Sequence, residues 1–242
     1  MLSCPLRTRN LQKTGPIPVT KGTEMAKATL SISSKNYSSW SLRGWLLCKF
    51  AGLDFTEELI PTNDPSARAE LLLLSPSFLV PCLKHGSVKT WGSLGIAEYL
   101  NEQFPDAGLW PKDASARALC RSISGEMHSG FSNLRSALPM NIQAHYPNFK
   151  IWAGAQADID RVQTIWSERL EASKGPYLFG KTLTVADAMY APVCSRFTTY
   201  GVDMDAACTA YAKRIMALPE MAEWIKGAKA EPADMEELDA EF

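Results

Sequence analysis

The stretch KNYSSWSLRGWLL, residues 35–47, joins a run of small polar residues to a run of apolar residues. Just before it, ATLSIS at 28–33 places an apolar residue at every second position, which predicts a half-buried strand. Inside the stretch, Leu42, Trp45 and Leu46 are spaced i, i+3 and i+4, which predicts the buried face of a helix. The sequence therefore predicts a strand, a serine-rich loop and a helix in succession, as in an α/β domain.

The residues that follow continue this alternation. Gly52 is placed to end the helix in the left-handed conformation that glycine adopts readily. The segments after it predict a strand at 54–61, a helix at 66–74, two short strands within 79–91 and a helix that begins at Ser93. The resulting order βαβαββα is that of a small α/β domain.

The second half of the chain has a different pattern. FPDAGLWPKDA at 104–114 concentrates proline, glycine and aspartate, which indicates a domain boundary. Beyond it, apolar residues at helical spacing predict long helices at 117–136 and 155–172. Thr184 stands three residues before Asp187, a spacing that forms a capping box at a helix start. The second half is therefore expected to be all-helical.

We accordingly divide the chain into an α/β domain at 26–106 and an all-helical domain at 112–230. Residues 1–25 are basic but lack the apolar run of a secretory signal, so we expect an unstructured leader, with a mitochondrial transit peptide as the alternative. Residues 231–242 hold six carboxylates in twelve positions, which predicts a solvated acidic tail.

The composition argues against several classes of function. With 25 Lys and Arg against 26 Asp and Glu, the net charge of −1 leaves no concentrated basic surface for nucleic acid. No stretch approaches the roughly 20 apolar residues that cross a membrane. The cysteines lack the spacing of a zinc site, so we expect reduced thiols and no metal; they are Cys4, Cys48, Cys82, Cys120, Cys194 and Cys208.

Four stretches of the chain resemble motifs of one family, the cytosolic glutathione transferases. They are YSSWSLRGWL (37–46), SPSFLVPCL (75–83), WGSLGIAEYL (91–100) and TVADAMYAPV (184–193). The first resembles the S-S-x-S-x-R loop of the serine-type classes. The resemblance implies a thioredoxin-like N-terminal domain that binds glutathione as co-substrate, and an all-α C-terminal domain that supplies a pocket for an electrophile. It also implies a cytoplasmic homodimer with a role in detoxification.

The resemblance places the catalytic hydroxyl at Ser38, with Ser39 as second choice because the register can shift by one residue. An unperturbed thiol, with a pKa of about 8.5, is only a few per cent thiolate at neutral pH. A serine hydroxyl that donates to the sulfur and the positive end of a helix dipole both favour the anion. Because serine is also a good N-cap, a purely structural role for this loop stays open.

The resemblance also assigns residues to the binding of glutathione. Val80 and Pro81, joined by a cis peptide bond, would present the backbone of Val80 to the extended tripeptide. Ser93, as cap of its helix, would hold the γ-glutamyl carboxylate with nearby amides. Trp40 and Gly92 complete the expected set.

Two departures from the family pattern lower the expected affinity for the tripeptide. Gly92 stands where the family has Glu or Asp, so a carboxylate for the γ-glutamyl ammonium is absent. Phe78 and Leu79 stand where a basic residue often holds the glycyl carboxylate. Lys35 or Lys84 would have to replace that basic group.

The expected electrophile pocket is lined by Tyr37, Met127 and Phe131, with the last two facing Trp40. An apolar stripe at helical spacing is equally typical of core packing, and this alternative stays open for Met127 and Phe131.

We therefore predict a glutathione transferase that joins the glutathione thiolate to a small hydrophobic electrophile. One alternative is a non-catalytic ligand- or protein-binding protein of the same fold, which Gly92 favours. Another is a glutathione-dependent isomerase, dehalogenase or ether-cleaving enzyme. His128 and Arg135 share a helix face in this interpretation and could bind an acidic electrophile, although a solvated face is the alternative.

Overall fold

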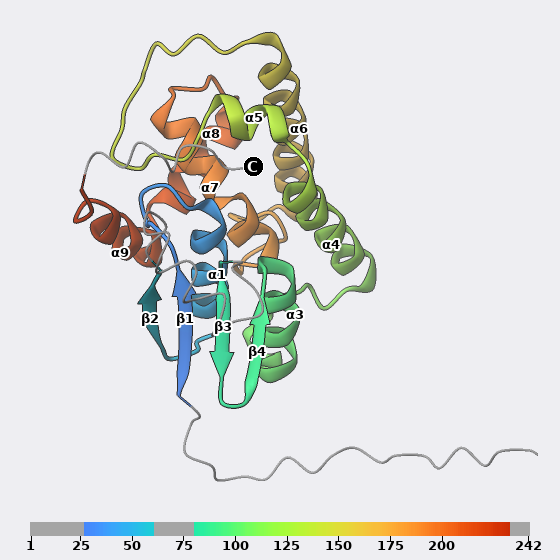
Figure 1. Cartoon of the computed structure of the whole chain (residues 1–242). Coiled ribbons are helices and arrows are strands. Elements are labelled where there is room, and N and C mark those ends of the chain that lie inside the picture. Colours follow the sequence, from blue (N-terminus) through green and yellow to red (C-terminus); the bar gives the residue numbers. More distant parts are fainter. Residues whose placement is uncertain (1–26, 61–79, 233–242) are drawn as a thin grey trace, which may run out of the picture.

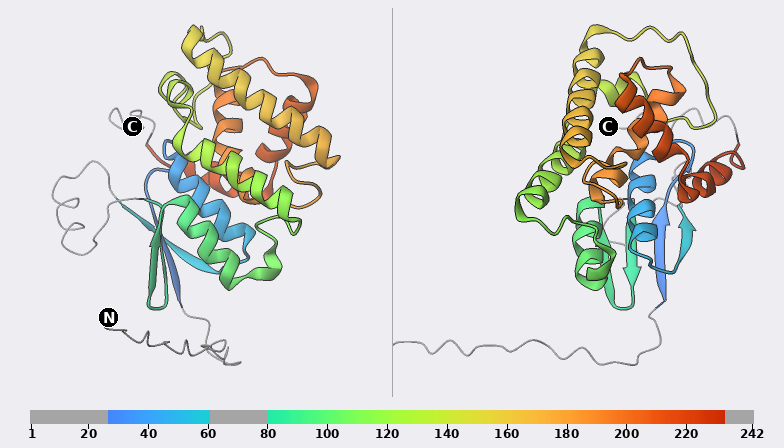
Figure 2. Two further views of the ribbon diagram at one scale, coloured as in Figure 1. Left: turned by 90° about the vertical axis from the view of Figure 1, so that its right-hand side faces the viewer. Right: turned by 180° about the vertical axis from the view of Figure 1, so that it is seen from behind.

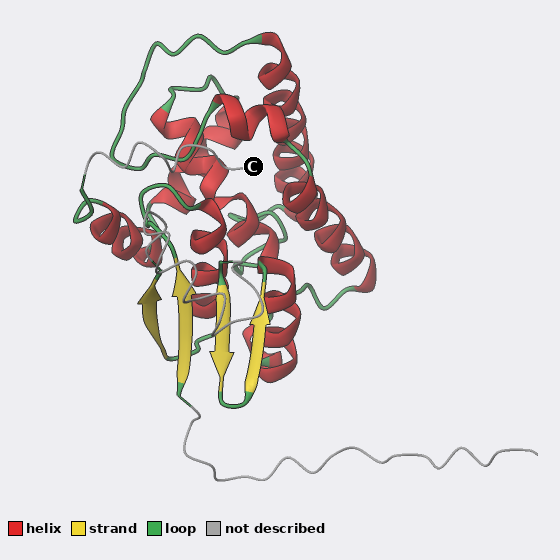
Figure 3. Ribbon diagram, in the orientation of Figure 1, coloured by secondary structure: helices red, strands yellow, loops and turns green. Residues whose placement is uncertain are grey.

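The computed structural model describes residues 27–60 and 80–232 (Figure 1). Its N-terminal part is built on a four-stranded sheet in the order β2-β1-β3-β4 (Figure 3). β1 (Ala28–Ile32) pairs in parallel with β2 (Phe55–Leu59) and antiparallel with β3 (Cys82–His85), which pairs antiparallel with β4 (Val88–Trp91). All four predicted strands are confirmed, and the predicted helix at 66–74 lies outside the described residues.

Two helices cover one face of the sheet, α1 (Ser39–Phe50) and α3 (Ser93–Gln103) (Figure 2, left). The alternation along β1 explains this, because Ala28, Leu30 and Ile32 are buried while the residues between them are partly exposed. α1 ends where expected, and Gly52 follows it with a φ of 72°.

In the described residues of the C-terminal part the regular elements are helices, joined by loops, with one isolated β-bridge between Tyr177 and Gly180. The helix α7 (Val185–Thr199) lies at the centre of this part with nearly all of its side chains buried. It packs against α1, α4 (Ala114–Ser129) and α8 (Ala206–Met216). Its predicted capping box is confirmed, since the Thr184 N–H donates to Asp187 Oδ2 at 2.8 Å. The elements of this part are η1 (Pro105–Ala107), α4 (Ala114–Ser129), α5 (Ser132–Ala137), α6 (Ala153–Ser173), α7 (Val185–Thr199), α8 (Ala206–Met216) and α9 (Pro219–Ala228).

The single helix predicted over 117–136 is wrong, because two helices occupy that range. Gly130 is extended, and Phe131 adopts the left-handed conformation with a φ of 60°. Neither conformation continues a right-handed helix. The chain therefore turns between α4 and α5, and it does so although the apolar spacing of the sequence runs on without interruption.

The ends of the chain lie largely outside the described residues. The expected leader at 1–25 lies outside them entirely, and only Glu231 and Pro232 of the expected tail are described. The proposed division at 106–112 stays a prediction. None of the helices in residues 27–60 and 80–232 combines the length and apolar character that a membrane span needs.

Candidate active site

Ser38 caps the N-terminus of α1 at the end of the loop formed by residues 33–38. Its backbone is extended, with φ and ψ of −86° and 97°, and its Oγ accepts a hydrogen bond from the Ser41 N–H at 3.2 Å. The side chain is half-buried. A hydroxyl at this place is therefore beside the positive end of the α1 dipole and is partly accessible.

The Ser38 hydroxyl already has an acceptor in this structure. It donates to Ser41 Oγ at 2.9 Å. Ser41 Oγ also accepts from the Ser33 N–H at 3.0 Å, and it lies 3.3 Å from Ser33 Oγ. Because a serine hydroxyl carries one proton, Ser38 must turn away from Ser41 before it can donate to a sulfur.

Ser39, the second choice for the catalytic hydroxyl, lies in a different environment. It is fully buried, and its Oγ accepts from Arg43 Nη1 at 3.1 Å. Arg43 Nε in turn donates to the carbonyl oxygen of Met189 in α7 at 2.9 Å. Ser39 therefore belongs to the contact between α1 and α7, and the geometry favours Ser38 as the accessible hydroxyl.

The turn before β3 brings the expected glutathione-binding segment next to α1 and α3. The Val80–Pro81 peptide bond is cis, as the resemblance implies. The carbonyl oxygen of Pro81 accepts from the Gly92 N–H at 3.0 Å, which joins this turn to the start of α3. Gly44 of α1 packs so closely on Pro81 that a Cβ added there would overlap the proline ring.

Gly92, rather than Ser93, is the N-cap of α3, so the expectation of a Ser93 cap is wrong by one residue. Gly92 has a φ of 76°, a conformation that glycine adopts without steric cost. Ser93 is the first residue of the helix, and its buried Oγ has no hydrogen-bond partner among the residues that the structure describes. A buried hydroxyl at a helix N-terminus that lacks a partner is well placed to bind a polar group of a ligand.

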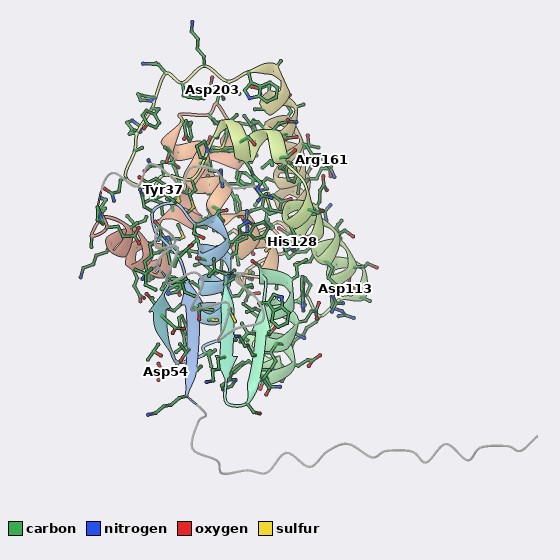
Figure 4. All side chains as sticks on the ribbon, viewed as in Figure 1. Tyr37, Asp54, Asp113, His128, Arg161 and Asp203 are labelled. Atoms are coloured by element: carbon green, nitrogen blue, oxygen red, sulfur yellow. The ribbon has the colours of Figure 1, made fainter. Side chains whose placement is uncertain are left out.

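Three basic side chains surround Trp40, which lies in the first turn of α1. The guanidinium carbons of Arg43 and Arg135 lie 4.6 and 4.8 Å from the centre of the Trp40 rings. The His128 ring meets Trp40 edge-on, with 4.9 Å between ring centres. Burial lowers the pKa of His128, and the charges of Arg43 and Arg135 lower it further. Figure 4 labels His128 on α4 and Tyr37 in the loop before α1.

The residues expected to line an electrophile pocket are mostly buried. Met127 is fully buried, and Phe131 and Tyr37 are 7% and 5% exposed. Met127 and Phe131 belong to the hydrophobic core, which is the alternative that the sequence left open. A contact of any of the three with a substrate stays a prediction.

Of the two lysines considered as substitutes for the missing basic residue, Lys35 is already engaged. Its Nζ lies 2.6 Å from a carboxylate oxygen of Glu57 and 5.2 Å from the centre of the Trp224 rings. Lys84 is exposed on β3, opposite Thr29 of β1 and Lys89 of β4, and its binding of the glycyl carboxylate stays a prediction.

Ser41 and Arg43 are fixed positions of the S-S-x-S-x-R pattern that were not among the expected site residues. The structure shows that Ser41 binds the Ser38 hydroxyl and that Arg43 binds Ser39 and Trp40. The pattern itself was the signal that could have identified them. Within the described residues there is no group of three His, Cys, Asp or Glu side chains that could hold a metal ion.

Comparison with known proteins identifies the family of this chain. The model of the glutathione S-transferase N-terminal domain matches residues 37–103, and that of the C-terminal domain matches residues 123–227. The chain is also 30% identical over 186 residues to the maleylacetoacetate isomerase of Rattus norvegicus, in an alignment that covers 75% of this chain and 83% of that protein. The chain belongs to the glutathione S-transferase family.

Other members of the glutathione S-transferase family agree with this assignment. Glutathione S-transferase 1 of Dianthus caryophyllus is 29% identical over 184 residues, which covers 75% of this chain and 82% of that protein. A solved glutathione transferase homolog from Burkholderia, with bound glutathione, matches with a TM-score of 0.65 at 21% identity and covers 85% of this chain and 99% of its own. The predicted glutathione-transferase architecture, a thioredoxin-like domain followed by an all-α domain, is thereby confirmed.

Proposed function

We propose that this family member binds glutathione, ionises its thiol at Ser38 and directs the thiolate at an electrophile held against the helical domain. The observation that carries the proposal is that three features lie on neighbouring elements, since α1 packs against α3 and against Pro81, and Pro81 is hydrogen-bonded to the start of α3. The three features are the half-buried Ser38 at the start of α1, the cis peptide bond before Pro81, and the buried Ser93 hydroxyl without a described partner.

The thiolate needs a stabilising environment. Lowering a thiol pKa by two units takes about 2.7 kcal/mol of differential stabilisation, which one charge-assisted hydrogen bond and a helix N-terminus can supply together. Ser38 would provide the hydrogen bond after its hydroxyl turns away from Ser41. The hydrogen bond from Ser38 to Ser41 Oγ would then be broken. The oxygen of Ser41 would remain bonded to the Ser33 N–H, so the loop keeps its shape during the change.

The glutathione backbone would lie along Val80, which stands two residues before β3 and outside the sheet pairing. Its γ-glutamyl carboxylate would accept from the Ser93 hydroxyl and from amides at the start of α3. In conjugation, the sulfur forms a bond to the electrophilic carbon, and a leaving group departs with the electron pair or a proton is taken up.

A second candidate function, glutathione-dependent isomerisation of an anionic substrate, is favoured by the basic side chains around Trp40. Arg135 and His128 could hold a carboxylate next to the thiolate. The thiolate would add to a carbon–carbon double bond, the resulting single bond would rotate, and expulsion of the thiolate would restore the double bond in the other geometry. Glutathione would be regenerated. The relative from Rattus norvegicus, a maleylacetoacetate isomerase, supports this candidate.

The test compares the parent protein with Ser93→Ala. Calorimetry measures glutathione binding, and we expect Ser93→Ala to weaken it about tenfold or more through loss of one hydrogen bond to a charged group. Ser124→Ala, a substitution of a fully buried serine on α4, is the matched control and should bind as the parent does. Failure of the parent to bind glutathione would overturn the proposal.

Activity assays separate the two candidates. The parent is assayed with a dinitrophenyl halide for conjugation and with a maleyl compound for cis–trans isomerisation, each with and without glutathione. Conjugation alone supports the first candidate, and isomerisation without consumption of glutathione supports the second. Binding without either activity would favour a ligand-binding protein of the same fold.

We also propose a cytoplasmic homodimer with a role in detoxification, as the family resemblance implies. Light scattering during gel filtration tests the dimer, because one chain has a mass of 26.7 kDa. A mass near that value would contradict it.

A further inference from the structure

Glu231, three residues after the end of α9, reaches back to the loop before α1. Its Oε2 accepts from the Ser34 hydroxyl at 2.5 Å and from the Asn36 N–H at 3.1 Å. Its Oε1 accepts from the Lys35 N–H at 2.6 Å. Glu231 is half-buried, so its carboxylate is not part of a solvated acidic tail, and the expectation of such a tail is wrong at this first residue.

Ser34 links this carboxylate to the cap of α1. The carbonyl oxygen of Ser34 accepts from the Ser38 N–H at 3.0 Å. The Ser34 Oγ, besides donating to Glu231, accepts from the Tyr37 N–H at 3.2 Å. One residue therefore stands between Glu231 and Ser38 in a continuous path of hydrogen bonds.

The helical domain holds both ends of this contact. Trp224 Nε1 of α9 donates to the carbonyl oxygen of Lys35 at 2.8 Å. Gln143 donates through its backbone N–H to Asn36 Oδ1 at 2.9 Å and through its side chain to the carbonyl oxygen of Glu231 at 3.2 Å. The loop conformation is thus set by groups about one hundred or more positions away in the sequence.

We propose that Glu231 is a positioning residue, which acts through Ser34 to hold Ser38 where it can donate to the glutathione sulfur. This inference rests on the proposed function. Two N–H groups and one hydroxyl of the loop converge on a single carboxylate, and charge-assisted hydrogen bonds of this kind are stronger than neutral ones. Without the carboxylate, three groups of the loop lose their common acceptor. Ser34 is then held less firmly, and with it the position of Ser38 relative to the thiol.

A matched control lies on the preceding helix. Glu223 of α9 also reaches the N-terminal part of the chain, where its carboxylate binds Lys49 Nζ at 2.9 Å in the last turn of α1. Substitution of Glu223 removes the same charge and another contact to α1, but it leaves the loop before α1 untouched.

The experiment measures the ultraviolet absorbance of the bound glutathione thiolate against pH, together with kcat and KM, in Glu231→Gln, Glu231→Ala, Glu223→Gln and Glu223→Ala. We expect the apparent thiol pKa in the complex to rise by about one unit in Glu231→Ala and by less in Glu231→Gln, which keeps one oxygen acceptor. We expect kcat at neutral pH to fall about tenfold in Glu231→Ala, with KM for glutathione within about threefold of the parent. Both Glu223 variants should titrate as the parent does.

The outcomes separate the inference from the proposed function. A parent complex whose thiol titrates at the value of free glutathione would overturn both. A parent with a lowered thiol pKa and Glu231 variants that match it would overturn only the role of Glu231. If Glu231→Ala does not fold, Glu231→Gln against Glu223→Gln decides the question, because an equal titration in the two variants contradicts the inference and a rise in Glu231→Gln alone supports it.

Discussion

Ser38 and Ser41 exchange two hydrogen bonds at the start of α1. The Ser41 N–H donates to Ser38 Oγ at 3.2 Å, and the Ser38 hydroxyl donates to Ser41 Oγ at 2.9 Å. The first bond caps the helix, and it uses an oxygen lone pair of Ser38 and not its proton. Ser38 can therefore keep its capping bond while its proton moves to another acceptor, so the structural and catalytic roles of this serine are compatible.

This separation predicts different effects of Ser38→Gly and Ser38→Ala. Glycine is nearly as good an N-cap as serine, so Ser38→Gly should reduce the free energy of unfolding by only a few tenths of a kcal/mol, whereas Ser38→Ala should cost about 1 kcal/mol. Both variants lack the hydroxyl and should lose most of the activity, on the order of a hundredfold. Urea unfolding and kcat/KM check the two effects. An active Ser38→Gly would show that the residue is only a cap.

The contact of Gly44 with Pro81 predicts that Gly44→Ala is destabilising. A Cβ at this position would overlap the Pro81 ring, which cannot move aside as a flexible side chain would. We expect a loss of about 1–3 kcal/mol of unfolding free energy and weaker glutathione binding, because Pro81 belongs to the proposed binding turn. Thermal unfolding and calorimetry measure the two losses.

Gly125→Ala is the control for that substitution. Gly125 also lies within a helix, α4, and a Cβ added there meets nothing within 4 Å. Alanine is the better helix former, so Gly125→Ala should raise the unfolding free energy by about 0.5–1 kcal/mol. Two glycine-to-alanine variants with the same sign would contradict the steric argument.

Local patterns in the sequence were sufficient to predict the four strands and α1. The alternation at 28–33 and the i, i+3, i+4 spacing of Leu42, Trp45 and Leu46 reflect which side chains face the core, and burial follows that pattern. The break at Phe131 was not predictable in this way. Its left-handed backbone has no signature in the residue type, and the sequence signal at this place is Gly130, which caps α4.

The candidate site also has one part that local sequence motifs predict and another that depends on tertiary contacts. Ser38 and the turn at Val80–Pro81 carry recognisable motifs, so they could be predicted from sequence together with the cis peptide bond. Glu231 could not be predicted from sequence, because 195 positions separate it from Asn36. An acidic residue within an acidic segment is also expected to be solvated. The sequence indicated His128 and Arg135 as a pair on one helix, but they lie on α4 and α5. Their convergence with Arg43 on Trp40 depends on tertiary contacts.

The lowered pKa of His128 predicts a pH dependence of stability. Because burial and two neighbouring guanidinium groups place the pKa in the folded state below the ordinary 6.5, the unfolded chain binds the proton more tightly. The unfolding free energy should therefore fall as the pH decreases through about 6.5. His128→Gln has no imidazole to titrate at this position and lacks this pH dependence. As the pH falls from 7.5 to 5.5, the unfolding free energy of the parent should therefore decrease relative to that of the variant. A constant difference across that range would contradict the prediction.

Arg135 should control the same titration. Arg135→Gln removes one of the two positive charges that lower the pKa of His128, so an NMR titration of the His128 ring should show a higher pKa, although burial remains the larger cause.

Maleate, as a dicarboxylate probe, should also raise the pKa of His128 in the parent if anions bind beside Trp40. The absence of a maleate effect in the parent would count against the isomerase candidate.

Gly92 predicts a conflict between stability and affinity. Its φ of 76° strains any other residue, while a Cβ added there meets nothing within 4 Å. Gly92→Ala and Gly92→Glu should therefore each lose about 1–3 kcal/mol of unfolding free energy. Only Gly92→Glu supplies the carboxylate that the family pattern has at this position, and it should bind glutathione up to about fivefold more tightly than Gly92→Ala, as expected for one exposed ion pair with the γ-glutamyl ammonium. Calorimetry on the two variants isolates the charge from the strain, and equal affinities would mean that the ammonium does not lie beside residue 92.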